Sequence, residues 1–126
     1  MAQVDRRTVI RASPSLVWSA LTDPRQLSRW FGAEAELTAS PGAPASFRWA
    51  DGRTRRAVVE TVWAERLLSL RWLPFERTAA GEARPIPSTR IQFILAQHPD
   101  GTVLEVRESP IDDVAMGTGA AAVGVR

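Results

Sequence analysis

The chain has no cysteine, no lysine and no tyrosine, and it has a single histidine, His98. Without cysteine there is no thiol nucleophile, no disulfide and no thiolate metal site, and without lysine no Schiff base can form. One histidine cannot build a multi-histidine metal site. Any catalysis would therefore use Asp, Glu, Ser, Thr, Arg or His98, and we expect neither a metal nor a cofactor.

Long apolar runs are also missing from the sequence. No run approaches the roughly 20 residues of a membrane span, and residues 1–13 lack the apolar centre of a signal peptide. The 126 residues, 44% of them hydrophobic and 24% charged, fit one globular domain over 1–126 that can bury a core without disulfides. We predict a cytoplasmic protein with no membrane span.

The charge is nearly balanced. All 16 basic residues are arginines, 14 residues are acidic, and the formal net charge is +2. A protein that binds nucleic acid through its phosphates shows a basic patch or stripe, whereas these arginines are scattered. We interpret the densest group, Arg53, Arg55 and Arg56, as a solvated strand end. The sequence therefore predicts no nucleic-acid partner.

Two short helices in series are predicted after a first strand over residues 3–11. Each begins with a capping residue followed by proline, Ser13-Pro14 and Asp23-Pro24, and proline is favoured at the first helical position. Apolar residues recur at helical spacing through both segments. Gly32 is a natural stop for the second helix.

After Gly32 the apolar period changes from helical spacing to alternation, which is typical of strands. Turn residues separate the alternating segments, as at 50–52 and 98–101. The mixture of Pro, Gly and charge over 74–88 predicts a long loop. The predicted strands are 33–40, 45–49, 53–63, 67–73, 89–97 and 102–108.

The helical segment carries a motif that resembles a known family. Residues 17–32 read Val-Trp-Ser-Ala-Leu-Thr-Asp-Pro, five further residues, and Trp-Phe-Gly. This order is similar to the opening motif of the family named after the heat-shock protein 90 ATPase activator, in the SRPBCC superfamily, also called START-like or birch-pollen-allergen-like. Residues 65–72 and 100–109 resemble later strands of the same family.

The resemblance implies an α+β, helix-grip (START-like) fold: a curved antiparallel sheet of about six to seven strands, with two short helices after the first strand. In the family a long C-terminal helix lies across the concave face of the sheet. Residues 110–126 lack the Trp and Leu stripe of that helix, and each glycine there disfavours a helix by about 1 kcal/mol relative to alanine. We expect this grip helix to be weak or missing, with 109–126 a weakly structured or atypical tail: truncated, divergent or docked differently.

A bent sheet that two short helices cannot fill leaves a cavity, and ligand sites are typically concave and mostly apolar. The resemblance therefore implies a cavity lined by inward side chains. Taken singly, each of these residues also fits ordinary core packing, so the prediction concerns the set. Its members are Leu27, Trp30, Phe31, Phe47, Trp49, Trp72 and Phe93.

Glu60 completes the predicted lining, because it lies between Val58 and Val62 and shares their face. If that face is concave, Glu60 is a buried carboxylate that needs a partner such as Arg71 or Arg90. Such a pair could orient a polar ligand group or supply an acid or base. The alternative is that Glu60 points to solvent.

Three functions are compatible with the sequence. The first is binding of a small hydrophobic or amphipathic ligand, such as a lipid, in the cavity. The second is an enzyme of the cyclase, dehydratase or hydrolase kind, since some START-like relatives catalyse ring closure or elimination. The third is a protein-interaction module, as the ATPase-stimulating relatives suggest. An uncovered cavity would also expose apolar surface, which favours a homodimer.

Overall fold

The computed structural model describes residues 4–111, which form one strand, then two helices, then seven strands. The helices are α1 (Pro14–Thr22) and α2 (Pro24–Phe31). The strands are β1 (Val4–Ile10), β2 (Glu34–Leu37), β3 (Pro44–Arg48), β4 (Thr54–Trp63), β5 (Leu67–Arg77), β6 (Ala83–Pro85), β7 (Thr89–His98) and β8 (Gly101–Pro110).

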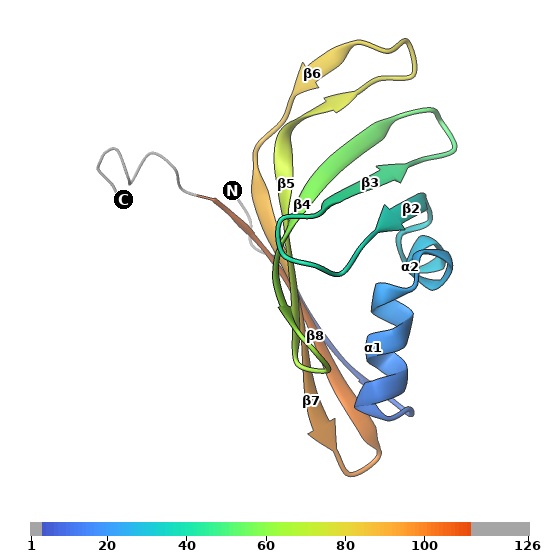
Figure 1. Ribbon diagram of the computed structural model, residues 1–126, viewed down its shortest axis with the longest axis vertical. Helices are drawn as coiled ribbons and strands as arrows, with labels where there is room; N and C mark the ends of the chain where they lie inside the picture. The colour runs from blue at the N-terminus through green and yellow to red at the C-terminus, as the bar shows by residue number, and fades with distance from the viewer. Residues whose placement is uncertain (1–3, 112–126) are drawn as a thin grey trace, which may run out of the picture.

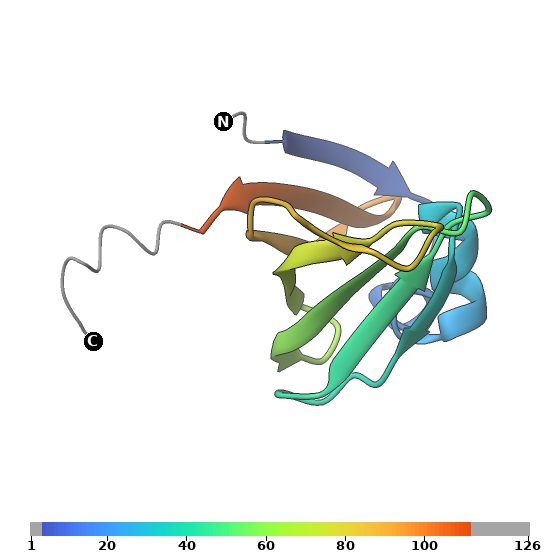
Figure 2. The ribbon, with the colours of Figure 1, turned by 90° about the horizontal axis from the view of Figure 1, so that it is seen from above.

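All eight strands form one antiparallel sheet in the order β1-β8-β7-β5-β4-β3-β2, with β6 added to β5. The sheet curls from β1 round to β2, and both helices lie on its concave side (Figures 1 and 2). The predicted fold class is therefore confirmed, with eight strands instead of six to seven. Among residues 4–111, no helix is long and apolar enough to cross a membrane.

Local signals at the helix ends act as predicted. The Ser13 hydroxyl accepts a hydrogen bond from the backbone N–H of Leu16, and the Asp23 carboxylate accepts one from the N–H of Arg25. This bond from Arg25 is the main reason that the pKa of Asp23 lies below its usual value. Gly32 ends α2 in the left-handed region, with φ of 62°. Capping by side chain and by glycine thus sets the boundaries of both short helices.

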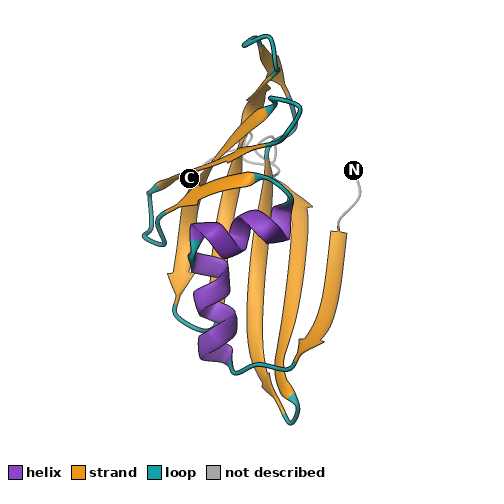
Figure 3. Ribbon diagram, turned by 90° about the vertical axis from the view of Figure 1, so that its right-hand side faces the viewer, coloured by secondary structure: helices purple, strands orange, loops and turns teal. Residues whose placement is uncertain are grey.

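The core lies between the helices and the concave face. Alternate strand residues point inward, so that Ile91, Phe93 and Leu95 of β7 share one buried face. Figure 3 shows that α1 and α2 cover only part of the sheet and leave the concave side of β8 and β1 open to view. The helices bury Val17, Leu21 and Leu27 in the same core cluster.

The predicted loop over 74–88 is wrong in part. Strand β5 continues to Arg77, turns at Gly81, and returns as β6. The backbone N–H of Thr78 donates to Glu82 and that of Gly81 donates to Thr78, which closes the turn. This hairpin extends the sheet beyond the region that the helices cover.

An irregularity around Pro74 interrupts the pairing of this extension with β4. Ala57 pairs with Trp72, and Arg55 pairs with Glu76, so two steps along β4 match four steps along β5. Proline is tolerated at a bulge because the ladder does not need its missing N–H. Because both counts are even, the facing of β5 is not reversed, and Glu76 is buried on the same face as Trp72.

Strand β8 extends through Ser109 and Pro110, which the sequence assigns to the tail. The expectations for a weak or missing grip helix, and for the rest of the tail, fall on residues 112–126 and lie outside the described residues.

Gly101 stands where the start of β8 meets the link between β1 and α1. Its φ is 143°, which disfavours other residues. An added Cβ would overlap the carbonyl oxygen of Ile10 and lie 3.0 Å from the Cα of Arg11. The neighbouring Thr102 hydroxyl donates to the carbonyl of Ala12 at 2.7 Å. This hydrogen bond stabilises the close approach of the two segments.

We predict that Gly101→Ala lowers the free energy of unfolding by about 3 kcal/mol, through backbone strain and overlap together. Gly81→Ala is the matched control, because Gly81 has a φ of 87° but open space around its Cα, and we expect a loss of about 1 kcal/mol there. Urea unfolding measures both. Equal losses in the two variants would show that the contact with Ile10 is unimportant.

Candidate functional site

A half-buried guanidinium faces the concave side of the sheet beyond the helices. Arg55 lies two positions before Ala57 and four before Val59, which both point into the core. Its guanidinium carbon lies 4.3 Å from the ring centre of Trp72. The Arg55 Nε is buried, and no described residue accepts its hydrogen bond. A buried donor without an acceptor costs about 1–3 kcal/mol, so this nitrogen is a place where a ligand or water atom is needed.

Two carboxylates flank this arginine, and each already has a partner. Glu76 is 3% exposed and forms ion pairs with Arg84 and, at 3.8 Å, with Arg53. Glu108 accepts a hydrogen bond of 2.7 Å from the hydroxyl of Thr89. Together these side chains enclose a hollow of about 320 Å³. It is lined by Arg53, Arg55, Glu76, Ile86, Pro87, Thr89 and Glu108.

The Arg55 side chain stays charged in this position. Burial lowers its pKa below the ordinary arginine value, while the carboxylates of Glu108 and Glu76 act in the opposite direction. An arginine pKa starts so far above neutrality that the guanidinium remains protonated in proteins. The hollow, which we call the polar end, therefore presents a fixed positive charge.

An apolar groove of about 290 Å³ lies on the same concave side, between the two helices and the end of β1. Ile10, Leu16, Val17 and Trp30 are among the side chains that line it. Leu16 and Trp30 are 64% and 48% exposed, which is unusual for large apolar side chains. We call this hollow the apolar end.

Inward residues of β7 and β8 connect the two ends. The ring of Trp30 meets the ring of Phe93 edge-on, with centroids 6.3 Å apart. Phe93 pairs with Val106, and two positions along the strands Ile91 pairs with Glu108. The four steps from Phe93 to Thr89 span roughly 13 Å at the rise of a strand. The two hollows share no lining residue, and we call the inward face of β7 and β8 between them, together with the two ends, the trough.

The predicted lining residues fall into different environments. Leu27, Phe47, Trp72 and Phe93 are buried in the core. In the trough, Phe93 lies under Trp30 and Trp72 lies under Arg55.

Of the other three predicted lining residues, two lie outside the core cluster and the third has a side chain that the structure does not describe. Trp30 forms part of the apolar end. Trp49 lines a separate hollow at the corner of α2 and β2, together with Ser28 and Arg48. Phe31 is the last residue of α2, and its side chain is not among those that the structure describes.

Glu60 lies on the convex face, opposite the trough. Its carboxylate forms ion pairs with Arg90 at 2.7 Å and with Arg71 at 3.4 Å, the partners that the sequence suggested. Glu60 follows the inward Val59 and shares the face of Val58, which pairs with Arg71, so alternation places it beside the outward arginines. The pair therefore stabilises the outside of the sheet and is separated from the predicted lining residues.

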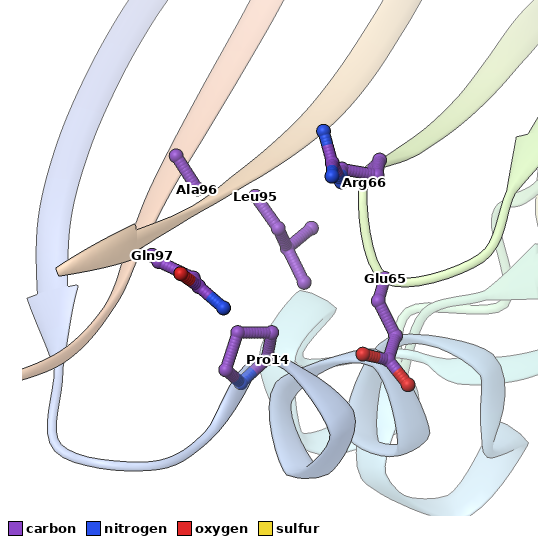
Figure 4. Close-up of a pocket in the computed structure, with 6 residues that line it drawn as sticks. All are labelled: Pro14, Glu65, Arg66, Leu95, Ala96 and Gln97. Carbon is purple, nitrogen blue, oxygen red and sulfur yellow. The ribbon is translucent and has the colours of Figure 1, made fainter.

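Another hollow, of about 350 Å³, lies where α1 begins, beside the turn between β4 and β5 and the end of β7 (Figure 4). Its polar side chains are those of Glu65, Arg66 and Gln97, and all three are exposed. Glu65 adopts a φ of 64° in the turn. Because water can satisfy these groups, this hollow supports no functional assignment.

A family model described as "Activator of Hsp90 ATPase homolog 1-like protein" matches residues 11–125. The chain belongs to this family. The resemblance seen in residues 17–32 is thereby confirmed. No curated protein matches the chain in sequence.

Solved structures share the fold of this family member. Protein MLL2253 from Mesorhizobium loti is 21% identical with a TM-score of 0.73, over 93% of this chain and 88% of that one. The Aha1 dimer from Colwellia psychrerythraea is 20% identical with a TM-score of 0.69, over 88% and 78% of the two chains. DynU16, described as a putative protein in the dynemicin biosynthetic locus, is 25% identical with a TM-score of 0.69 over 86% of this chain, which spans only 37% of DynU16.

Sequence reasoning missed the charged residues of the polar end, although part of the signal was present. Alternation from Leu104 and Val106 continues to Glu108, and alternation back from Ile91 leads to Thr89. The interpretation of the arginine group as a solvated strand end fits the exposed Arg56 but is wrong for Arg55. Glu76 has the same facing as Trp72, four positions earlier, but the loop predicted over 74–88 leaves it outside any strand. Among the described residues, no cluster of metal-ligating side chains is found.

The pairing of Glu60 predicts a pH dependence. Hydrogen bonding to Arg90 is the main reason that the pKa of Glu60 lies below its ordinary value of 4.5. Since the unfolded chain then takes up the proton first, this stabilisation is present above about pH 4.5 and is lost as the pH falls through the folded-state pKa.

We therefore expect Glu60→Gln to unfold more easily at neutral pH and to lose less stability than the unaltered protein below about pH 4.5. Because the Glu60 side chain is 26% exposed, solvent screening limits the difference to about 0.5 kcal/mol. Urea titrations at several pH values measure it, with Glu36→Gln, an exposed position on β2, as the control. The same acid dependence in Glu60→Gln and the unaltered protein would rule out this origin.

Proposed function

We propose that this family member binds a small amphipathic molecule along the trough, with its polar group beside Arg55 and its apolar part beside Trp30. The observation that carries this proposal is the buried Arg55 Nε without an acceptor among residues 4–111, in a polar hollow on the same concave side as the apolar end. Ligand sites commonly combine an apolar wall with a few placed polar groups that fix orientation.

The apolar end supplies the driving force for binding in this proposal. Trp30 and Leu16 expose large apolar area beside the buried core, and covering such area stabilises a complex by roughly 25 cal/mol per Å². The edge-on contact between Trp30 and Phe93 holds the indole ring over the trough. A ligand can therefore bind against a wall that is largely formed in advance, which limits the entropy lost on binding.

A second copy of the chain is the other candidate occupant of the apolar end. The exposed Leu16 and Trp30 favour it, and the related Colwellia psychrerythraea protein was solved as a dimer. Under this alternative the protein is a homodimer through the α1 surface, and the trough is closed by its partner. The cytoplasmic location predicted from the sequence remains a prediction under both candidates.

Trp30→Ala should weaken binding of N-phenyl-1-naphthylamine, a neutral probe that fluoresces in apolar surroundings, by about five- to tenfold, because the wall of the apolar end is lost. Trp63→Ala is the matched control, since Trp63 is 61% exposed and contacts Arg66 at the turn after β4. We expect less than a twofold effect there. Circular dichroism checks that both variants fold.

Light scattering on the same samples separates the two candidates. Binding of the probe by a monomer supports a ligand site. A dimer that becomes monomeric in Trp30→Ala and binds no probe supports the second copy. Equal probe binding by Trp30→Ala and Trp63→Ala would contradict the proposed location of the apolar end.

A further inference from the structure

We infer that the polar end selects a carboxylate monoanion, so that the ligand class is an amphipathic monocarboxylic acid; this rests on the proposed function. The inference concerns the charge and shape of the ligand group beside Arg55. The proposed function specifies neither of them. It follows from the partners of each charged side chain, from the net charge of the polar end and from the orientation of one guanidinium.

The partners show which charges are open to a ligand. Glu76 forms ion pairs with both Arg84 and Arg53, and the Glu108 carboxylate accepts a hydrogen bond from the hydroxyl of Thr89. Arg55 forms no ion pair within 4.0 Å with any described residue, and its Nε has no acceptor there. The Nε of Arg53 is also buried without an acceptor, but Arg53 forms ion pairs with Asp51 and Glu76. Arg55 is thus the cation of the polar end that has no ion pair with a described residue.

Charge balance limits the negative charge that the ligand can carry. The guanidiniums of Arg53, Arg55 and Arg84 are matched by the carboxylates of Asp51, Glu76 and Glu108. Arg55 is the cation of this group without an ion pair, so one negative charge can be placed beside it. A dianion would add a second charge close to Glu108, and like charges at short range are unfavourable in a partly buried site.

Geometry favours a planar, two-oxygen acceptor. The indole ring of Trp72 lies 4.3 Å below the guanidinium and restrains its orientation. Stacking on a ring leaves the edge of the guanidinium free, and arginine binds carboxylates through two parallel N–H bonds along such an edge. A carboxylate can therefore satisfy the buried Nε and a terminal nitrogen together, which a hydroxyl group cannot do.

Competition against N-phenyl-1-naphthylamine tests this inference with three probes of equal chain length, decanoate, 1-decanol and decylamine, below their micelle concentrations. On the unaltered protein we expect decanoate to displace the dye at about a tenfold lower concentration than decanol, since a charged carboxylate can accept two bonds from a guanidinium, whereas a hydroxyl accepts one. Decylamine should displace it no better than decanol.

The matched variants are Arg55→Gln and Arg56→Gln, because Arg56 is the adjacent, exposed arginine of the same strand. Arg55→Gln should bring decanoate to the level of decanol, whereas Arg56→Gln should keep the tenfold preference. The comparison of decanoate with decanol on the unaltered protein needs no variant, so it decides the matter even if Arg55→Gln fails to fold.

Failure of the inference and failure of the proposed function give different results. Equal displacement by decanoate and decanol, or a preference that survives Arg55→Gln, overturns the inference while the trough remains a binding site. A preference for decylamine overturns it in favour of the carboxylates of Glu76 and Glu108. Absence of binding by the dye and by every probe overturns the proposed function together with the inference.

Discussion

The length of the two helices is the constraint on which the concave face depends. Helices α1 and α2 have nine and eight residues, so each is about 12–14 Å long. The strands β4, β7 and β8 have ten residues and extend about 33 Å. The helices therefore cover one part of the sheet, and the inward side chains beyond them must find other partners. Leu27 and Phe93 are covered by this packing, whereas Arg55 and Trp72 lie past its limit.

Charged side chains occupy the concave face beyond the part that the helices cover. In place of further apolar residues, β4, β5 and β8 contribute Arg55, Glu76 and Glu108 to the concave face, and β6 adds Arg84. Buried charges are costly unless they are paired and hydrogen-bonded. Glu76 and Glu108 meet this condition within the described residues, and Arg55 meets it only in part. This difference, between satisfied and unsatisfied groups on one surface, is what distinguishes a candidate site from an ordinary polar patch.

The fold could largely be predicted from the sequence, because its signals are local. Ser13-Pro14 and Asp23-Pro24 mark the helix starts, and the Trp-Phe-Gly that ends the motif at Gly32 marks both the helix end and the family. The site could be predicted only in part, because charge and proline suggest solvent or loop at positions that alternation places inward. Arg55 has the facing of Ala57, and Glu76 has that of Trp72, but the sequence favours a strand end and a loop there. Glu60 has the outward facing of Val58, and alternation alone does not tell which face of a strand is concave.

The central claim is that the edge of the Arg55 guanidinium is the part of the protein that meets the ligand. Nuclear magnetic resonance of the arginine Nε–Hε groups tests it most directly, with the Arg55 signal identified by its loss in Arg55→Gln. Titration with decanoate should shift the Arg55 signal as the trough fills and leave that of Arg56 in place. A ligand that saturates the protein without moving the Arg55 signal would contradict the account.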